Sequence, residues 1–289
     1  MNISLVTSPM SFANLPANSI ALDGAVRGTH LDYSSNRWSF DHHAGDQHSI
    51  STRSTALQTL LALRAGLDVS TINNVFVSSV DADSVIATAL LMRPELRNRC
   101  EVITLVTLHL DTVDSMGPVG ALSPSSLNFH YSLRAGYKQE LTTELLLEKV
   151  EYFYDLLREE RLFESTPEEK NPVTLVSISL NGDVQMENGE FGFSDLYSKA
   201  NIGILHDPDG TRTTIGIKSS FVSDKHLLND GLFDKLNAAE INAGAATNED
   251  GTIESGWGGK DLVGGSPFQG KTLLSINQIT EIVCNFLKE

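Results

Sequence analysis

The segment from residue 74 to residue 92 constrains the fold more than any other part of the chain. It opens with NVFVSS, which is β-branched and apolar enough for a buried strand, and closes with SVIATALLM, which predicts a helix. The acidic turn Asp81-Ala82-Asp83 joins the two. Strand, turn and helix form the unit of parallel α/β sheets, which bind ligands beyond the carboxyl ends of their strands. We therefore expect an α/β domain with a ligand site at this turn.

The sequence predicts three further helices, two from their periodicity and one from the length of its apolar run. Ser54–Ala65 has apolar residues at helical spacing and precedes Gly66, a typical C-cap. Residues 101–110 are apolar on nearly every side, and their length favours a buried helix. The clearest element, Lys138–Phe163, is a long amphipathic helix that ends at the turn residues STPEEKNP. We place the domain boundary at this turn.

Beyond the boundary, the pattern indicates a smaller α+β domain. The expected elements are strands at residues 173–180, 202–206 and 211–219, a glycine-rich segment at 251–270 and a final helix at 276–287. The expected organisation is an α/β domain with a parallel sheet over residues 1–137, a linker helix over residues 138–172, and the α+β domain over residues 173–289.

The charge balance limits the partners that this chain can have. It carries 21 lysine and arginine residues against 37 aspartate and glutamate residues, for a formal net charge of −16. This balance argues against binding of duplex nucleic acid. A small phosphorylated substrate remains compatible with it, because bound divalent cations neutralise clustered carboxylates.

Cysteine usage and hydropathy indicate the compartment. Cys100 and Cys284 are the only cysteines, so we expect neither a disulfide framework nor a CxxC-type zinc site. The N-terminus does not resemble a signal peptide, and no apolar run is long enough to span a bilayer. We therefore expect a cytoplasmic protein with no membrane partner. Its oligomeric state stays open, with a homodimer as one alternative.

Histidine and aspartate cluster between residues 30 and 48. His30-Leu31-Asp32 precedes Asp41-His42-His43, and His48 follows. Carboxylates and neutral imidazoles together are ligands for Mn²⁺, Fe²⁺ or Zn²⁺. Because adjacent residues point apart on a strand, we expect one of His42 and His43 to bind metal and the other to meet substrate. The alternative is that these histidines only form hydrogen bonds within turns.

Two pairs of aspartates provide further candidate ligands. Asp81 and Asp83 lie on the same side of an extended turn, where two carboxylates repel unless a cation binds them. The alternative is that Asp83 only caps the helix that begins at Ser84. In HLDTVDSMGP, Asp111 and Asp114 share one helix face and either could complete the site, or both could be solvated residues of a helix end.

The segment GWGGKDLVGGSPFQG is the candidate substrate-binding loop. Glycine at this density lets backbone N–H groups approach an anion, and Lys260 and Lys271 add positive charge. The spacing of a Walker A loop is absent. We expect Arg212 or Lys218 close to this loop if their strand neighbours it. A flexible surface loop is the alternative.

These motifs together resemble the DHH phosphoesterase superfamily, which includes pyrophosphatases, exonucleases, oligoribonucleases and cyclic-dinucleotide phosphodiesterases. Asp41-His42-His43 spells out the name of the superfamily, and VDADSVIATALL is similar to its D-x-D motif. GWGGKDLVGG resembles the glycine motif of the DHH-associated C-terminal domain, and GIKSS resembles the strand before it. The resemblance implies a DHH-like metal-binding domain, a linker helix and a DHH-associated domain that binds substrate.

The resemblance implies a site with two metal ions, and two Mn²⁺ are expected, with Mg²⁺, Fe²⁺ or Co²⁺ as alternatives. Asp32 would bridge the ions, with Asp23 as the alternative bridge. His43 and Asp41 would be the catalytic residues, with His43 facing the scissile phosphate. The candidate metal ligands are His30, Asp32, His42, Asp81, Asp83, Asp111 and Asp114. The candidate substrate-binding residues are Lys218, Ser219, Gly258, Gly259, Lys260, Gly264 and Gly265.

Three departures from the superfamily pattern keep alternatives open. The D-x-D motif follows DHH instead of preceding it, Val77 replaces a metal-binding histidine for which His30 or His109 would have to substitute, and Lys260 replaces a histidine of the glycine motif. The first hypothesis is a metal-dependent phosphoesterase acting on a small substrate, such as a short oligonucleotide or a cyclic dinucleotide. The alternatives are a non-catalytic binding or regulatory protein of the same fold and a metal-dependent hydrolase of another fold.

Overall fold

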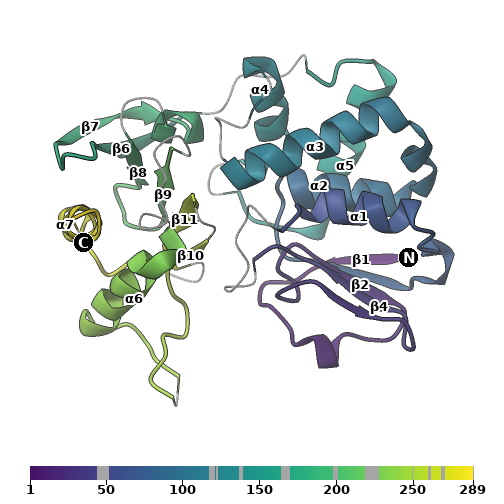
Figure 1. The fold of residues 1–289 in the computed structure, drawn as a ribbon, viewed down its shortest axis with the longest axis horizontal. Coiled ribbons are helices and arrows are strands. Elements are labelled where there is room, and N and C mark those ends of the chain that lie inside the picture. The colour runs from purple at the N-terminus through teal and green to yellow at the C-terminus, as the bar shows by residue number, and fades with distance from the viewer. Residues whose placement is uncertain are drawn as a thin grey trace. The chain divides into compact units, whose positions relative to one another are not determined.

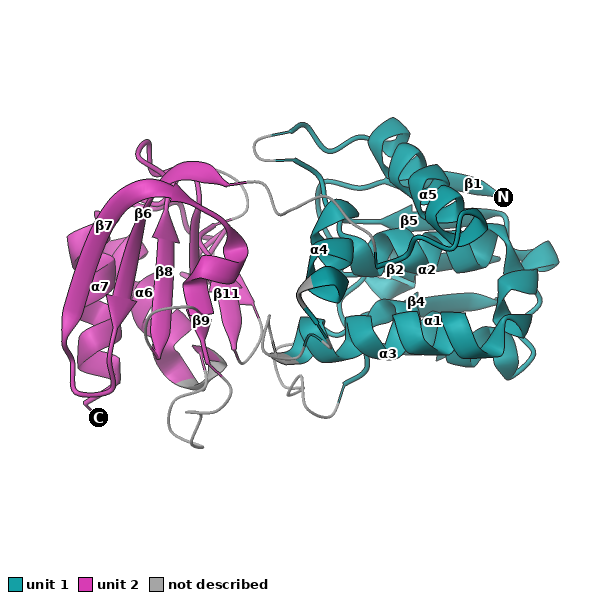
Figure 2. Ribbon diagram, turned by 90° about the horizontal axis from the view of Figure 1, so that it is seen from above, with its two compact units in different colours: residues 1–115, 120–168 teal, residues 116–119, 169–289 magenta. Residues whose placement is uncertain are grey.

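Three parallel strands that end level with one another determine where a site can form in this chain. They belong to the first of two compact units in the computed structural model, residues 1–115 with 120–168, while the second comprises residues 116–119 with 169–289 (Figure 2). The structure describes residues 1–43, 52–116, 121, 123–136, 139–163, 170–197, 201–218, 228–248, 250–259, 262–267 and 271–288. Within these residues the fold is mixed α/β. It has seven α-helices in total, and each unit contains one sheet.

The sheet of unit 1 has five strands in the order β1-β5-β2-β4-β3. Their bounds are β1 Asn2–Leu5, β2 Ser19–Leu22, β3 His30–Asp32, β4 Arg37–Phe40 and β5 Asn74–Val77. All neighbouring strands are parallel except β3, which pairs antiparallel with β4 at the edge. Leu22 at the end of β2 is in register with Phe40 of β4 and Val77 of β5. The residues that follow these three strands therefore leave the sheet at the same end, the carboxyl end of the parallel strands.

Five helices complete unit 1, and they lie on one side of its sheet (Figure 1). They are α1 Thr55–Arg64, α2 Ala82–Met92, α3 Cys100–Met116, α4 Pro124–Ser132 and α5 Thr143–Arg158. The helix predicted at residues 101–110 is confirmed as part of α3, but it is buried on one face only, because Leu105 and Leu108 are exposed. Within the described residues, no helix is both long enough and apolar enough to cross a membrane.

Helix α5 is shorter than the expected linker helix and packs into the core of unit 1. Leu146, Val150 and Phe153 are fully buried in this core. The Tyr154 hydroxyl donates a hydrogen bond to the Ala89 carbonyl of α2, at 2.8 Å. Its amphipathic face is thus used for packing within one unit, and residues 164–169, which follow it, lie outside the described residues.

Unit 2 contains a six-stranded sheet in the order β10-β11-β9-β8-β6-β7, in which all neighbours are antiparallel. Its elements are β6 Asn171–Ile178, β7 Val184–Phe191, β8 Ile202–His206, β9 Thr213–Ile217, β10 Gly258–Gly259, β11 Val263–Gly265, α6 Phe233–Asn242 and α7 Ile276–Phe286. Ile204 and Ile215 of the sheet share a buried cluster with Leu236 of α6 and Val283 of α7. The sequence predicted the final helix and three of these strands, but neither β7 nor α6.

Candidate metal centre

The polar residues of unit 1 meet at the carboxyl ends of its central parallel strands. Asp23 follows β2, Asp41-His42-His43 follows β4, and the turn that carries Asp81 and Asp83 follows β5. Helix α3 adds Asp114 near its C-terminus. Four separate segments of the chain therefore supply this cluster, which lies where open α/β sheets bind their ligands.

The backbone and two serines orient Asp23 toward the histidines. Asp23 has a φ of 51°, a left-handed conformation that aspartate adopts more readily than most residues. One carboxylate oxygen, Oδ2, accepts a hydrogen bond from the Ser84 hydroxyl at 2.6 Å and a second from the Ser79 hydroxyl. The other oxygen, Oδ1, lies 3.4 Å from His42 Nε2. The serines thus fix the side chain so that one oxygen remains directed at the imidazoles.

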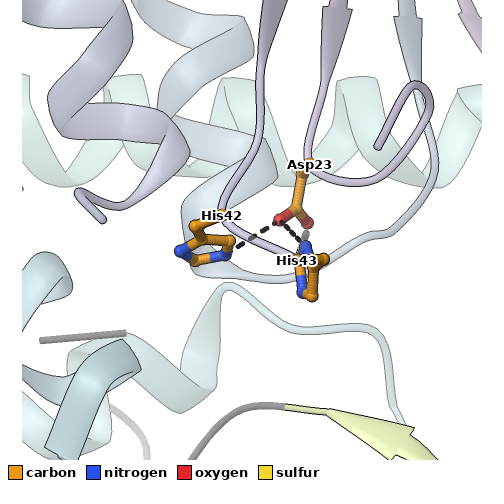
Figure 3. A group of neighbouring side chains, drawn as sticks. All are labelled: Asp23, His42 and His43. Carbon is orange, nitrogen blue, oxygen red and sulfur yellow. Dashed lines mark ion pairs between the residues drawn. The ribbon is translucent and has the colours of Figure 1, made fainter. Parts of the chain in front are cut away.

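Figure 3 shows Asp23 between His42 and His43. His43 Nδ1 lies 3.7 Å from Asp23 Oδ1, and the two imidazole rings are nearly perpendicular. Asp23 and His42 are buried, whereas the His43 side chain is 36% exposed. These three residues form a group whose ligand atoms could hold a metal ion, with one face open to solvent through His43.

A second group shares His42 with the first. His42 Nδ1 lies 3.1 Å from Asp114 Oδ2, and His42 Nε2 lies 3.7 Å from Asp83 Oδ2. Within each group the ligand atoms lie within 4.8 Å of one another. One imidazole and two carboxylates are a donor set that suits borderline divalent metals such as Mn²⁺, Fe²⁺ and Zn²⁺.

Asp83 and Asp111 also bind the first N–H groups of α1. Asp83 accepts hydrogen bonds from the amides of Thr55 at 2.7 Å and Ala56 at 2.9 Å, and Asp111 accepts one from Ser54 at 2.6 Å. The N-cap of α2 is Asp81, not Asp83, because Asp81 accepts the Ser84 amide hydrogen at 3.0 Å. Each carboxylate oxygen has a second lone pair, so a capping role for Asp83 is compatible with metal binding.

Asp41 holds His43 in a defined orientation. Asp41 Oδ1 lies 2.7 Å from His43 Nδ1, and Asp41 Oδ2 accepts the Gly28 amide hydrogen at 2.6 Å. When His43 donates its Nδ1 hydrogen to Asp41, Nε2 is the nitrogen left for a ligand. A carboxylate that fixes an imidazole in this way is common behind metal-binding and acid–base histidines.

The carboxylates of the centre differ in the pKa shifts that their surroundings impose. Burial and the negative charge of Asp114 raise the pKa of Asp83 to about 7, and burial and the charge of Asp23 raise the pKa of Asp81. Burial would also raise the pKa of Asp23, but its hydrogen bond with His42 and the neighbouring imidazoles hold that pKa well below its usual value. The surroundings therefore stabilise the ionised form of Asp23 and disfavour the ionised forms of Asp81 and Asp83.

The structure does not bring three of the candidate residues to this centre. His30 and Asp32 lie on edge strand β3, where His30 stacks on Phe12 and Asp32 pairs with Arg37 at 2.7 Å. His109 is buried, and its Nε2 lies 2.8 Å from the Ser126 carbonyl, so it joins α3 to α4. None of the three belongs to either metal-binding group among the described residues, and the same holds for Asp81 and Asp111. Asp23, the alternative bridge, is the aspartate that lies beside His42 and His43, and His48 lies outside the described residues.

The two serines beside Asp23 are functional candidates that the sequence reasoning did not find. Ser79 is hydrogen-bonded to Asp23, Asp81 and Ser84 and so connects the ends of β2 and β5. The only sequence signal was that Ser79 ends the predicted buried strand and Ser84 begins the predicted helix, on either side of the acidic turn. Serine is common in turns, so its presence there does not indicate a functional role unless the neighbouring strand is known.

In unit 2, packing already accounts for two glycines of the predicted substrate loop. A Cβ atom on Gly264 would lie 2.2 Å from the Phe233 ring, and one on Gly259, whose φ is 154°, would lie 2.4 Å from Gly264 Cα. A Cβ on Gly258 would meet nothing within 4 Å, and one on Gly265 would approach the Thr213 carbonyl at 3.3 Å. Lys218 follows β9 directly, whereas Ser219 and Lys260 lie outside the described residues.

We expect Gly264→Ala to destabilise unit 2 and Gly258→Ala to leave its stability unchanged. Overpacking a filled site costs about 1–3 kcal/mol, while Gly258 has room for a methyl group. Urea unfolding of both variants measures this difference. Equal stability of the two variants would contradict the packing explanation. Weaker substrate binding by a fully stable Gly258→Ala variant would support the ligand contact that the resemblance implies.

Comparisons with protein-family models, curated proteins and solved structures found no match to this chain.

Proposed function

We propose that this protein is a metal-dependent phosphoesterase that hydrolyses a phosphodiester or phosphoanhydride in a small substrate. The observation that carries the proposal is a convergence of side chains from four chain segments at the carboxyl ends of the parallel strands β2, β4 and β5. These side chains are Asp23, His42, His43, Asp83 and Asp114. The DHH and D-x-D motifs, which suggested this chemistry, are the segments that follow β4 and β5. Phosphoryl hydrolysis on such a donor set is a common use of two-metal sites.

The donor set fits a divalent ion at His42 Nε2. If His42 carries its hydrogen on Nδ1, which lies 3.1 Å from Asp114 Oδ2, the Nε2 lone pair points to the side where Asp23 Oδ1 and Asp83 Oδ2 lie, at 3.4 Å and 3.7 Å. In this arrangement Asp114 orients the imidazole. If Asp114 is itself a ligand, it would hold a second ion beside the first, as we propose for two Mn²⁺. His42 would bind only one of the two ions, because a neutral imidazole has a single lone pair.

A bound divalent ion supplies Lewis-acid activation of water and of the phosphoryl oxygens. The chain's own residues supply position and protons. Asp41 holds Nδ1 of His43 and leaves Nε2 of this half-exposed ring to donate a hydrogen bond or a proton to a phosphate oxygen. Ser79 and Ser84 keep Asp23 in its ligand orientation, which limits reorganisation when substrate binds.

Asp114→Asn distinguishes one ion from two. If Asp114 only orients His42, the variant keeps the stoichiometry of the wild type and loses about 10–100-fold in Mn²⁺ affinity. If Asp114 is a ligand, the stoichiometry falls from two to one. Isothermal titration calorimetry measures both quantities. Our two-ion proposal expects the second result, and wild-type binding of a single Mn²⁺ would contradict it.

The function is tested by turnover of pyrophosphate, a linear dinucleotide, a cyclic dinucleotide and bis-p-nitrophenyl phosphate, each with Mn²⁺ or with EDTA. We expect hydrolysis of at least one substrate that requires Mn²⁺ and that His43→Ala reduces strongly while the variant still folds. A folded wild-type protein that binds no Mn²⁺ and hydrolyses none of the four would contradict the proposal and favour a non-catalytic binding protein.

A further inference from the structure

Phosphate binding at this centre requires positive charge in addition to the metal. Asp23 and Asp83 lie beside His42, Asp81 accepts a hydrogen bond from Ser79 next to Asp23, and the whole chain has a net charge of −16. A substrate with more than one phosphate would bring further negative charge to the same place. Such a substrate needs a cationic side chain beside the ions, because unpaired like charges in a partly buried site repel strongly.

Arg53 is a cationic side chain held at the edge of the centre. Its Nη1 lies 3.2 Å from Asp111 Oδ2, and the side chain is 60% exposed. Asp111 is held in turn by the Ser54 amide, so the contact fixes Arg53 beside the N-terminus of α1. A guanidinium group has five N–H donors in a planar fork, so one contact with Asp111 leaves donors for an anion.

The position of Arg53 is beside the ligand atoms, not over them. Asp111 belongs to neither metal-binding group, but Asp114, one turn later on α3, lies 3.1 Å from His42 Nδ1. Three residues of helix correspond to about 4.5 Å along the axis. If one phosphate of a substrate were bound at the centre, Arg53 would therefore lie on the side of the adjacent group of that substrate.

We propose that Arg53 binds a second phosphate of the substrate, adjacent to the one that is cleaved, and so selects substrates with two neighbouring phosphates. This inference rests on the proposed metal-dependent phosphoesterase function. The fork of arginine matches phosphate oxygens with two parallel hydrogen bonds, which lysine cannot reproduce. Arg53 is thus a specificity-determining residue and leaves metal binding to the aspartates and histidines.

The test uses two probes that the enzyme cannot hydrolyse and a matched control on the same helix. The probes are methylenediphosphonate, with two phosphonate groups, and inorganic phosphate, with one. Arg64 is the control because it is the last residue of α1, about 15 Å along the helix from Arg53. Like Arg53 it contacts α3, which runs alongside α1 (Figure 2), through a hydrogen bond to Thr104 at 2.8 Å. Calorimetry with the Mn²⁺-loaded full-length protein gives the affinity for each probe and, separately, for Mn²⁺.

We expect Arg53→Ala to weaken methylenediphosphonate binding at least about tenfold and phosphate binding about twofold or less, with Mn²⁺ affinity unchanged. Arg53→Lys should recover only part of the loss, and Arg64→Ala should match the wild type. Equal effects on the two probes, or no effect, would overturn the inference while wild-type Mn²⁺ binding still supports the proposed function. A wild-type protein that binds no Mn²⁺ would overturn both.

Discussion

Asp23→Asn is expected to reduce Mn²⁺ affinity by at least about 100-fold and to remove Mn²⁺-dependent turnover. The substitution keeps the shape of the side chain, and asparagine also tolerates the left-handed backbone at this position. Its amide oxygen can still accept hydrogen bonds from Ser79 and Ser84. What it loses is the negative charge directed at His42 and His43, which is the charge that a divalent ion requires.

The control is Asp32→Asn, which changes the residue that sequence reasoning first favoured as the bridge. Asp32 pairs with Arg37 and accepts hydrogen bonds from Ser34, away from the histidines. We expect Asp32→Asn to bind Mn²⁺ like the wild type. Calorimetry of both variants, with circular dichroism to verify folding, measures the contrast. Loss of Mn²⁺ binding in Asp32→Asn but not in Asp23→Asn would refute the site described here.

The fold was predictable where the sequence pattern is local. The strand and helix at residues 74–92 follow from apolar runs on either side of an acidic turn, and helix α3 follows from the length of its apolar run. Strand β7 was not predictable, because nearly all of VQMENGEF is exposed and only pairing with β6 makes it a strand. The amphipathic pattern of α5 showed that one face is buried, but not that this face packs inside unit 1.

The sequence predicted the motifs of the site, but not which of the candidate aspartates the order of the strands would bring together. DHH and D-x-D were recognisable from residue type and from their place after predicted strands. The choice between Asp23 and Asp32 depends on β2 lying between β4 and β5 while β3 runs antiparallel at the edge, and no local pattern contains that order. Asp111 and Asp114 share a helix face, and only the packing of α1 on α3 separates them.

Mn²⁺ binding is expected to strengthen with pH up to about 7, because Asp83 must lose a proton before it binds the ion. Burial and the charge of Asp114 raise the pKa of Asp83 to about 7 in the metal-free protein, so below that pH the ion competes with a proton. This carboxyl alone lowers the affinity about tenfold for each pH unit below 7. Calorimetric titrations at pH 5.5, 6.5 and 7.5 measure the dependence, and Asp83→Asn is the variant in which this contribution disappears.

The same proton affects the stability of the metal-free protein in the opposite sense. A carboxyl whose pKa is higher in the folded than in the unfolded state binds more protons when folded, so stability falls as pH rises between the two pKa values. For Asp83 this interval runs from its ordinary value of 3.8 to about 7. We therefore expect the unfolding midpoint of the metal-free wild type to fall across this interval relative to Asp83→Asn, and Mn²⁺ to restore it most strongly at pH 7.5. If the unfolding midpoints of the two proteins changed equally with pH, the charge of Asp83 would not destabilise the folded state. Repulsion within the centre would then not drive metal binding.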